Sequence, residues 1–194
     1  MIYIKITFLF ITTIFLLYIL ILSFVSLIPF RKKSLTNTKF KPLDVIIPAF
    51  NEERVISKCI NSVINQKGNI VRRIFLVIDN CTDRTLNICT KYVKKNINIR
   101  IIKRENGVPS KINSILEALN LVKGDFFVIL DADIILDKNA ILMVYKSLIQ
   151  NKAHFATSLV GLYKTDNIIC KIMGWDRLFR QRIIQRGRSF FLYE

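Results

Sequence analysis

Histidine and cysteine are scarce in this sequence of 194 residues. It has one histidine, His154, and four cysteines, none of which forms a C-x-x-C pair. Structural zinc usually needs about four clustered cysteine or histidine ligands, so no zinc site is expected. The cysteines are predicted to be free thiols, buried or partly buried, in a reducing compartment. Internal repeats are also absent, and the length is enough for one domain with a real core.

Acidic residues are few, since fourteen Asp and Glu stand against thirty Lys and Arg, a formal net charge of +16. Such a charge favours anionic partners: nucleic acid, anionic lipid or phosphorylated substrates. The alternative is a general bias toward isoleucine, lysine and asparagine, which would leave part of the charge without a function. No nucleic-acid-binding motif is present, so nucleic acid is not an expected partner.

The N-terminal segment is strongly apolar, with no charged residue over 6–30. A helix needs about 20 residues to span a bilayer, so this length is sufficient. Because a basic cluster at 31–33 follows it and only Lys5 precedes it, the positive-inside rule predicts that the rest of the chain faces the cytoplasm. We therefore predict a single-pass anchor in the inner or plasma membrane at 1–33 and a linker at 34–43. A cleaved signal peptide is disfavoured by the length and by the lack of an A-x-A-like site, and a buried core helix by the length of the apolar run.

Residues 44–161 alternate between short apolar runs and helical patterns. This alternation is typical of an α/β fold with a parallel or mostly parallel sheet. Because the apolar run at 126–130 is unbroken, that strand is predicted to be buried on both faces. The predicted strands are 44–51, 74–79, 97–103 and 126–130, with 154–161 as a candidate further strand; the predicted helices are 51–65, one ending near 95, one starting at 109 or 110, and 137–151.

Carboxylates follow two of these strands. Asp79 ends one, and Asp131 and Asp133 follow another. Residues i and i+2 of a strand point to the same side, so Asp131 and Asp133 are predicted to project together at the edge of the sheet where ligands bind. Two adjacent carboxylates repel each other unless a cation lies between them, and Mg²⁺ or Mn²⁺ prefers oxygen ligands shared with phosphates. An Asp-rich turn that caps a helix is the alternative.

The last segment, 162–194, is predicted to contain a basic amphipathic helix at 167–185. Such a helix can lie in the membrane interface. A packed surface helix with a solvated charged face is an equal alternative, because amphipathicity alone does not separate the two. The apolar side of this helix would carry Ile168, Ile172, Trp175, Phe179 and Ile183.

Four features occur in a fixed order along the chain: Val-Ile-Ile-Pro-Ala-Phe-Asn-Glu at 45–52, Val-Ile-Asp-Asn-Cys-Thr-Asp at 77–83, Lys111 before a helix, and Leu-Asp-Ala-Asp at 130–133. Together they resemble the nucleotide-sugar-binding half of a family 2 glycosyltransferase, in its Asn-Cys-Thr-Asp variant and with its D-x-D motif. The resemblance extends from about residue 44 to 139. It implies a GT-A-like, Rossmann-like fold.

The resemblance also implies roles for individual residues. Asp79 would hold the base or ribose of a nucleoside diphosphate sugar, and Lys111 would approach the diphosphate. Asp131 would contact the ribose or the sugar side and help to bind the metal, and Asp133 would ligate the divalent ion, Mg²⁺ or Mn²⁺. Positive charge there would neutralise the departing diphosphate. After Lys111 the family often has Ala-Leu-Asn, and this chain departs from that pattern. Four residues would border the base and ribose: Pro48, Ala49, Asn51 and Glu52.

An inverting transferase needs a general base, which in the family is an acid well downstream of D-x-D. The acids after the 137–151 helix are Asp166, Asp176 and Glu194, and none lies in a recognisable motif. No catalytic base is therefore identified. We expect 162–194 to be the start of an incomplete acceptor region.

The leading prediction is a membrane-anchored, cytoplasm-facing glycosyltransferase that works with inversion. Its donor would be a nucleotide sugar, with a UDP-sugar favoured, and its acceptor would be a lipid-linked or cell-envelope glycan. One alternative is a truncated, non-catalytic remnant that binds nucleotide sugar, or one part of a split transferase. Another is a basic membrane-tethered protein that binds nucleic acid or anionic lipid.

Overall fold

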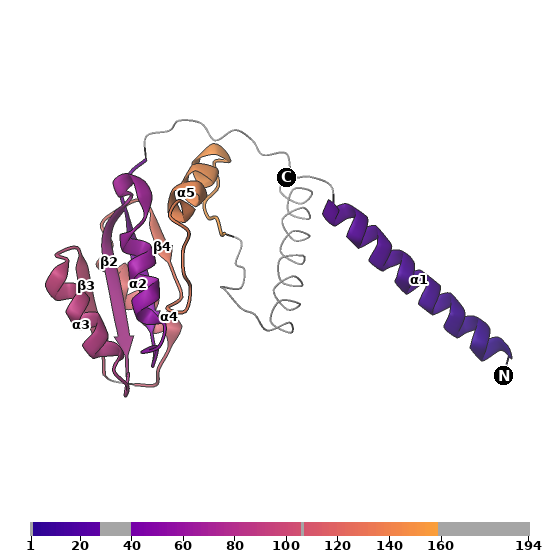
Figure 1. Ribbon diagram of the computed structural model, residues 1–194, viewed down its shortest axis with the longest axis horizontal. Coiled ribbons are helices and arrows are strands. Elements are labelled where there is room, and N and C mark those ends of the chain that lie inside the picture. The colour runs from indigo at the N-terminus through magenta and orange to yellow at the C-terminus, as the bar shows by residue number, and fades with distance from the viewer. Residues whose placement is uncertain (1, 28–39, 106, 159–194) are drawn as a thin grey trace. The chain divides into compact units, whose positions relative to one another are not determined.

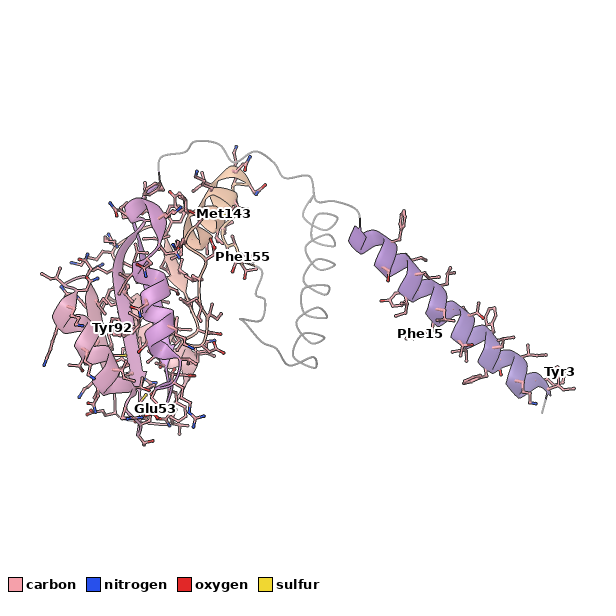
Figure 2. The ribbon with its side chains drawn as sticks, in the orientation of Figure 1. Tyr3, Phe15, Glu53, Tyr92, Met143 and Phe155 are labelled. Atoms are coloured by element: carbon pink, nitrogen blue, oxygen red, sulfur yellow. The ribbon has the colours of Figure 1, made fainter. Side chains whose placement is uncertain are left out.

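The computed structural model describes residues 2–27, 40–105 and 107–158, which belong to two units that we treat separately. In the first unit, α1 (Ile2–Leu27) is a single helix whose described side chains are nearly all exposed, as Tyr3 and Phe15 illustrate in Figure 2. Within the described part of the chain, no helix qualifies as long and apolar enough to cross a membrane. The transmembrane prediction over 6–30 is thus not confirmed. The predicted helix at 167–185 lies outside the described residues.

The second unit contains a four-stranded parallel sheet in the order β3-β2-β1-β4 (Figure 1). The predicted α/β fold with a parallel sheet is confirmed. The candidate strand at 154–161 is not formed over 154–158, and its remainder lies outside the described residues. The strands are β1 (Leu43–Ala49), β2 (Val71–Asp79), β3 (Ile99–Arg104) and β4 (Phe127–Ile129). The helices are α2 (Ile56–Ile64), α3 (Thr85–Lys95), α4 (Lys111–Leu119) and α5 (Ala140–Gln150), with a short 3-10 turn at Lys67–Asn69.

One face of the sheet is covered by α2, α3 and α5. Alternate residues of β1, such as Val45 and Ile47, point into this core because side chains alternate along a strand. Burial of each large apolar side chain stabilises the fold by about 1.5–3 kcal/mol. A nine-residue helix is too short to be stable alone, so α2 is held by the face that it buries here: Ile56, Cys59, Ile60 and Val63.

The opposite face is covered by α4, which packs over β1 and β2. Ala118 of α4 contacts the core residues Ile46 and Phe75. On the same face of β4, Phe127 and Ile129 are 43% and 44% exposed. The prediction that the strand at 126–130 is buried on both faces is therefore wrong. β4 is a three-residue strand at the edge of the sheet, and α4 lies over β1 and β2 instead.

The helix predicted from Asn51 begins later, at Ile56. Asn51 does not cap it. Its φ of 55° is in the left-handed region, and its side-chain oxygen accepts the backbone N–H of Thr82 at 2.8 Å. Asparagine tolerates this conformation better than most residues do. The chain therefore turns across to the neighbouring loop before α2 starts.

The predicted free thiols are confirmed for the three cysteines that the structure describes. Cys59 and Cys89 are buried and Cys81 is half-buried, all without disulfide partners. Burial raises the pKa of Cys59 and of Cys89 to about 12, so both stay protonated at neutral pH. They behave as small core side chains.

Candidate functional site

A cavity of about 360 Å³ lies at the carboxyl edge of the sheet. Ligands of open α/β sheets bind at this edge. Seven of the eight residues predicted for the site line the cavity, and Asn51 does not. Their roles in binding remain predictions. The complete lining is Pro48, Ala49, Phe50, Glu52, Asp79, Pro109, Ser110, Lys111, Ser114, Asp131, Ala132 and Asp133.

The loop after β1 is tied to the loop after β2. Besides the bond between Asn51 and Thr82, the backbone N–H of Glu52 donates to Oγ1 of Thr85 at 2.9 Å. The backbone N–H of Glu53 donates to Oδ2 of Asp83 at 3.0 Å; Glu53 is labelled in Figure 2. The Asn-Cys-Thr-Asp stretch thus braces the first loop. Asn51 serves this bracing with its amide oxygen, a role that the sequence did not indicate.

Asp79 is a buried carboxylate at the end of β2, and it accepts hydrogen bonds from four groups. Three reach Oδ2: Nη1 of Arg104 at 2.6 Å, the backbone N–H of Ser110 at 2.7 Å and Oγ of Ser114 at 2.9 Å. Among the described residues, Oδ1 accepts one hydrogen bond, from Nδ2 of Asn80 at 3.0 Å. Since each carboxylate oxygen can accept about two donors, Oδ1 retains an accepting position. The carboxylate is held rigidly, and one of its oxygens can still receive a donor from a ligand.

Arg104, Ser110 and Ser114 were not predicted as parts of the site. A buried carboxylate requires donors, so the sequence implied that partners of Asp79 exist without saying which. The predicted strand at 97–103 stopped one residue before Arg104, which is the last residue of β3. Ser110 and Ser114 are four residues apart, a spacing that places residues on one side of a helix. This spacing in the sequence could have indicated that both serines belong to the site.

Lys111 and Asp131 face each other across the cavity entrance. The ammonium Nζ lies 2.5 Å from Oδ1 of Asp131, and the two side chains are 57% and 47% exposed. Exposed ion pairs are worth little, about 0–1 kcal/mol. A phosphate group can therefore replace Asp131 as the partner of the ammonium at a small cost in free energy. The approach of Lys111 to a diphosphate stays a prediction.

Carboxylates concentrate on the other side of the cavity. Burial raises the pKa of Glu52, and the negative charges of Asp133, Asp83 and Asp131 raise it further. This mutual repulsion creates a site that favours a cation. Among the residues described, no group of three or more His, Cys, Asp or Glu side chains could hold a metal ion by itself. The role of Asp131 and Asp133 as metal ligands stays a prediction. Two carboxylates would suit Mg²⁺ or Mn²⁺, because these ions take further ligands from water and phosphate.

The two aspartates do not reach the cavity in the predicted way. β4 ends at Ile129, and Asp131 lies in a turn in which the N–H of Ile134 donates to its carbonyl oxygen at 3.1 Å. The two-residue period of a strand does not apply beyond Ile129. The stated reason for their joint orientation is therefore wrong, although both residues line the cavity.

Phe50 adds a large aromatic surface to a cavity that is lined by both polar and apolar residues. It follows β1 directly, lines the cavity and is 50% exposed. An exposed aromatic ring beside hydrogen-bonding groups is suited to a flat ligand. The residue belongs to the stretch at 45–52 that carried the resemblance, but it was not among the predicted site residues.

Comparison with known proteins agrees with this arrangement. The chain is 30% identical over 114 residues to a poly(ribitol-phosphate) beta-glucosyltransferase of Bacillus spizizenii, a match that covers 57% of this chain and 18% of the relative. It is 31% identical over 99 residues to the poly(ribitol-phosphate) beta-N-acetylglucosaminyltransferase TarS of Staphylococcus aureus, covering 50% of this chain and 17% of the relative. The matched stretches are less than a fifth of each relative's length.

Solved structures share the fold. A crystal structure of S. aureus TarS in complex with UDP aligns with a TM-score of 0.50 at 25% identity, over 57% of this chain and 33% of that one. The mannosyltransferase PcManGT from Pyrobaculum calidifontis, in complex with GDP-Man and Mn²⁺, aligns with a TM-score of 0.56 at 20% identity, over 75% of this chain and 41% of that one. The second likeness concerns the fold alone.

The sequence profile of glycosyl transferase family 2 matches residues 44–189, which is more than half of the chain. Apart from Leu43, the first residue of β1, this range includes all the described strands and helices of the second unit together with the cavity-lining residues. The chain belongs to glycosyl transferase family 2.

Proposed function

We propose that the protein is an inverting glycosyltransferase whose cavity binds a nucleoside diphosphate sugar. The observation that carries this proposal is the convergence of Asp79, Lys111, Asp131 and Asp133 on one cavity at the carboxyl edge of a parallel sheet. The likeness to TarS, which has been crystallised with UDP, supports a UDP-sugar as the donor. The donor identity and the transfer reaction are both parts of the proposal.

Each end of the cavity suits one part of such a donor. Phe50 presents a ring face on which a base can stack, and Oδ1 of Asp79 can accept an N–H of that base. Lys111 exchanges its ion pair with Asp131 for the diphosphate. Asp131 and Asp133 would hold Mg²⁺ or Mn²⁺, and a bound ion supplies positive charge that stabilises the departing diphosphate. Lys111 contributes a second positive charge to the same group.

The acceptor is proposed to be a cell-envelope or lipid-linked glycan. Two relatives are named for transfer to poly(ribitol phosphate), a polymer. We also propose that α1 holds the protein at the inner or plasma membrane, with its catalytic unit in the cytoplasm. In support, large apolar side chains of α1 such as Phe8, Phe15 and Phe24 are 62% to 70% exposed. Fractionation of the tagged chain between membrane and soluble fractions tests this location.

A donor-binding part that needs a second region for transfer is the other candidate. Between Asp133 and residue 158 the sole acid is Asp137, and it does not line the cavity. Oδ1 of Asp137 accepts the N–H of Asn139 at 3.0 Å. Among the described residues after Asp133, therefore, no acid lines the cavity, where a general base for the acceptor hydroxyl would be needed. Such a protein would bind donor without releasing nucleoside diphosphate.

Binding and turnover measured together test both candidates. The full chain is purified in detergent and titrated with UDP-, GDP- and dTDP-sugars in Mn²⁺ or Mg²⁺, with binding followed by calorimetry and nucleoside diphosphate release by a coupled assay. Asp133→Ala is the test variant. Asp125→Ala is the matched control, because Asp125 is an exposed acid paired with Lys41 and does not line the cavity.

Binding and release that are lost in Asp133→Ala and kept in Asp125→Ala are the expected result. Binding without release in the unaltered chain would favour the donor-binding part. Failure of the unaltered chain to bind any nucleotide sugar would overturn the proposal.

A further inference from the structure

The turn that carries Asp131 and Asp133 is poorly held by the sheet. β4 has three residues and pairs only with β1, and the last backbone bond beyond it joins the N–H of Leu130 to the carbonyl oxygen of Ile46 at 2.9 Å. From residue 130 to 139 the chain forms neither helix nor strand. Something other than strand pairing must fix the path of this segment.

Side chains of α2 and of the residue that follows its C-terminal end contact the segment at three points. In α2, Sγ of Cys59 lies 3.6 Å from the carbonyl oxygen of Asp131, and Oγ of Ser62 accepts the N–H of Leu136 at 3.0 Å. Just beyond α2, Nε2 of Gln66 donates to the carbonyl oxygen of Asp137 at 2.6 Å. Each of these side chains contacts backbone, so the path of the chain itself is fixed.

Cys59 and Ser62 are three residues apart in α2, a spacing that brings helical side chains onto a common face. Gln66 follows the end of the helix, and its Nε2 also donates to the carbonyl oxygen of Ser62 at 3.1 Å. Gln66 is 9% exposed, and its Oε1 accepts the N–H of Ile141 at 3.1 Å. The apolar contacts of α2 come from Ile56, Cys59, Ile60 and Val63. The hydrogen bonds of Ser62 and Gln66 are therefore additional to the packing that holds the helix.

We propose that Ser62 and Gln66 are positioning residues that set the place of the Asp131–Asp133 turn opposite Lys111, and through it the affinity of the site for a divalent ion. This inference rests on the proposed function. Neither residue lines the cavity. The base end of the cavity is built separately, from Asp79 and its partners on β3 and α4.

This division of the cavity makes the proposal testable. Loss of Ser62 or Gln66 should weaken the ion end and leave the base end intact. A purely structural role would instead lower all binding in parallel with stability. Ligand-orienting partners of this kind typically change metal affinity by about 10- to 100-fold when removed.

The experiment compares Gln66→Met, Ser62→Ala and Ser62→Thr in the full chain in detergent. Gln66→Met keeps the volume and removes the three hydrogen bonds of the Gln66 side chain. Ser62→Ala is the milder change, and Ser62→Thr keeps the hydroxyl. Asn61→Ala is the matched control on the same helix, because Asn61 is exposed and no side-chain hydrogen bond of it is observed. Mn²⁺ affinity in saturating UDP is read by electron paramagnetic resonance, and UDP affinity without metal by calorimetry.

We expect Mn²⁺ to bind about tenfold more weakly or worse in Gln66→Met and measurably more weakly in Ser62→Ala. The metal-free UDP affinity of both should stay within about twofold of the unaltered chain, and Ser62→Thr and Asn61→Ala should bind like it. Unchanged Mn²⁺ affinity in Gln66→Met and Ser62→Ala would overturn the inference, and so would equal losses of both affinities. If the unaltered chain binds neither UDP nor Mn²⁺, the proposed function fails first and the inference with it.

Discussion

Replacement of Arg104 by methionine tests how the base end of the cavity is held. Arg104 is 11% exposed in its side chain and Asp79 is 4% exposed, and Nη1 lies 2.6 Å from Oδ2. Arg104→Met keeps an apolar stem of similar length and removes the guanidinium. The carboxylate then remains buried with one fewer partner, which is destabilising because a buried charge depends on its hydrogen bonds.

The expected magnitude follows from the partners that remain. Removal of one member of a fully buried ion pair costs about 3–5 kcal/mol. Here the N–H of Ser110 and the hydroxyl of Ser114 still donate to Oδ2. The loss should therefore be close to that of one hydrogen bond to a charged group, about 2–3 kcal/mol. With a typical urea dependence, this is a fall of about 1–2 M in the midpoint.

Urea unfolding of the full chain in detergent, followed by circular dichroism, measures this fall. Arg84→Met is the matched control, because Arg84 pairs with Glu53 at 3.2 Å and is 80% exposed, so its loss should barely move the midpoint. UDP affinity should also drop in Arg104→Met, since Asp79 loses its fixed orientation. Equal midpoints for the two variants would refute the reasoning and show that Asp79 does not depend on Arg104.

Three further variants test the rest of the cavity. Burial and the neighbouring carboxylates raise the pKa of Glu52 above its ordinary value of 4.5. The protonated carboxyl of Glu52 therefore stabilises the fold at pH values below 4.5, and this stabilisation is lost as the pH rises through the raised pKa. Glu52→Gln should therefore unfold at higher urea than the unaltered chain at pH 7 and at a similar concentration near pH 4, as urea titrations at both values would show. Lys111→Met should weaken UDP far more than uridine in calorimetry, because the ammonium is proposed to bind the diphosphate. Phe50→Ala should lose about 1–3 kcal/mol of UDP binding, and Phe50→Tyr should retain it.

Specific outcomes would contradict these expectations. A Glu52→Gln variant that is less stable than the unaltered chain at pH 7 would mean that the partners of the Glu52 carboxylate stabilise it more than the neighbouring carboxylates repel it. Equal losses of UDP and uridine affinity in Lys111→Met would show that the ammonium does not bind the diphosphate. Unchanged UDP affinity in Phe50→Ala would exclude stacking of the base on that ring.

Much of the architecture could be predicted from local sequence patterns. Apolar runs that alternate with helical periodicity predicted the parallel α/β sheet, and the aspartates after two strands predicted which edge carries the cavity. These predictions succeeded because the place of each strand along the chain and the period of its side chains depend on short stretches of sequence. Ser110 also begins α4 as a capping residue, since its Oγ accepts the N–H of Asn113.

Contacts between distant segments decided the rest. The apolar run at 126–130 could not reveal that α4 covers β1 and β2 and leaves Phe127 and Ile129 open, because burial depends on where another element packs. The segment that carries the D-x-D turn is held by the side chains of Ser62 and Gln66 and does not follow the period of a strand. Asn51 bonds to Thr82 rather than to its own helix. The sequence alone determined the order of strands and helices along the chain and which residues carry charge. Only the tertiary structure decided which of those charges meet, because hydrogen bonds act over a few ångströms between residues that lie far apart along the chain.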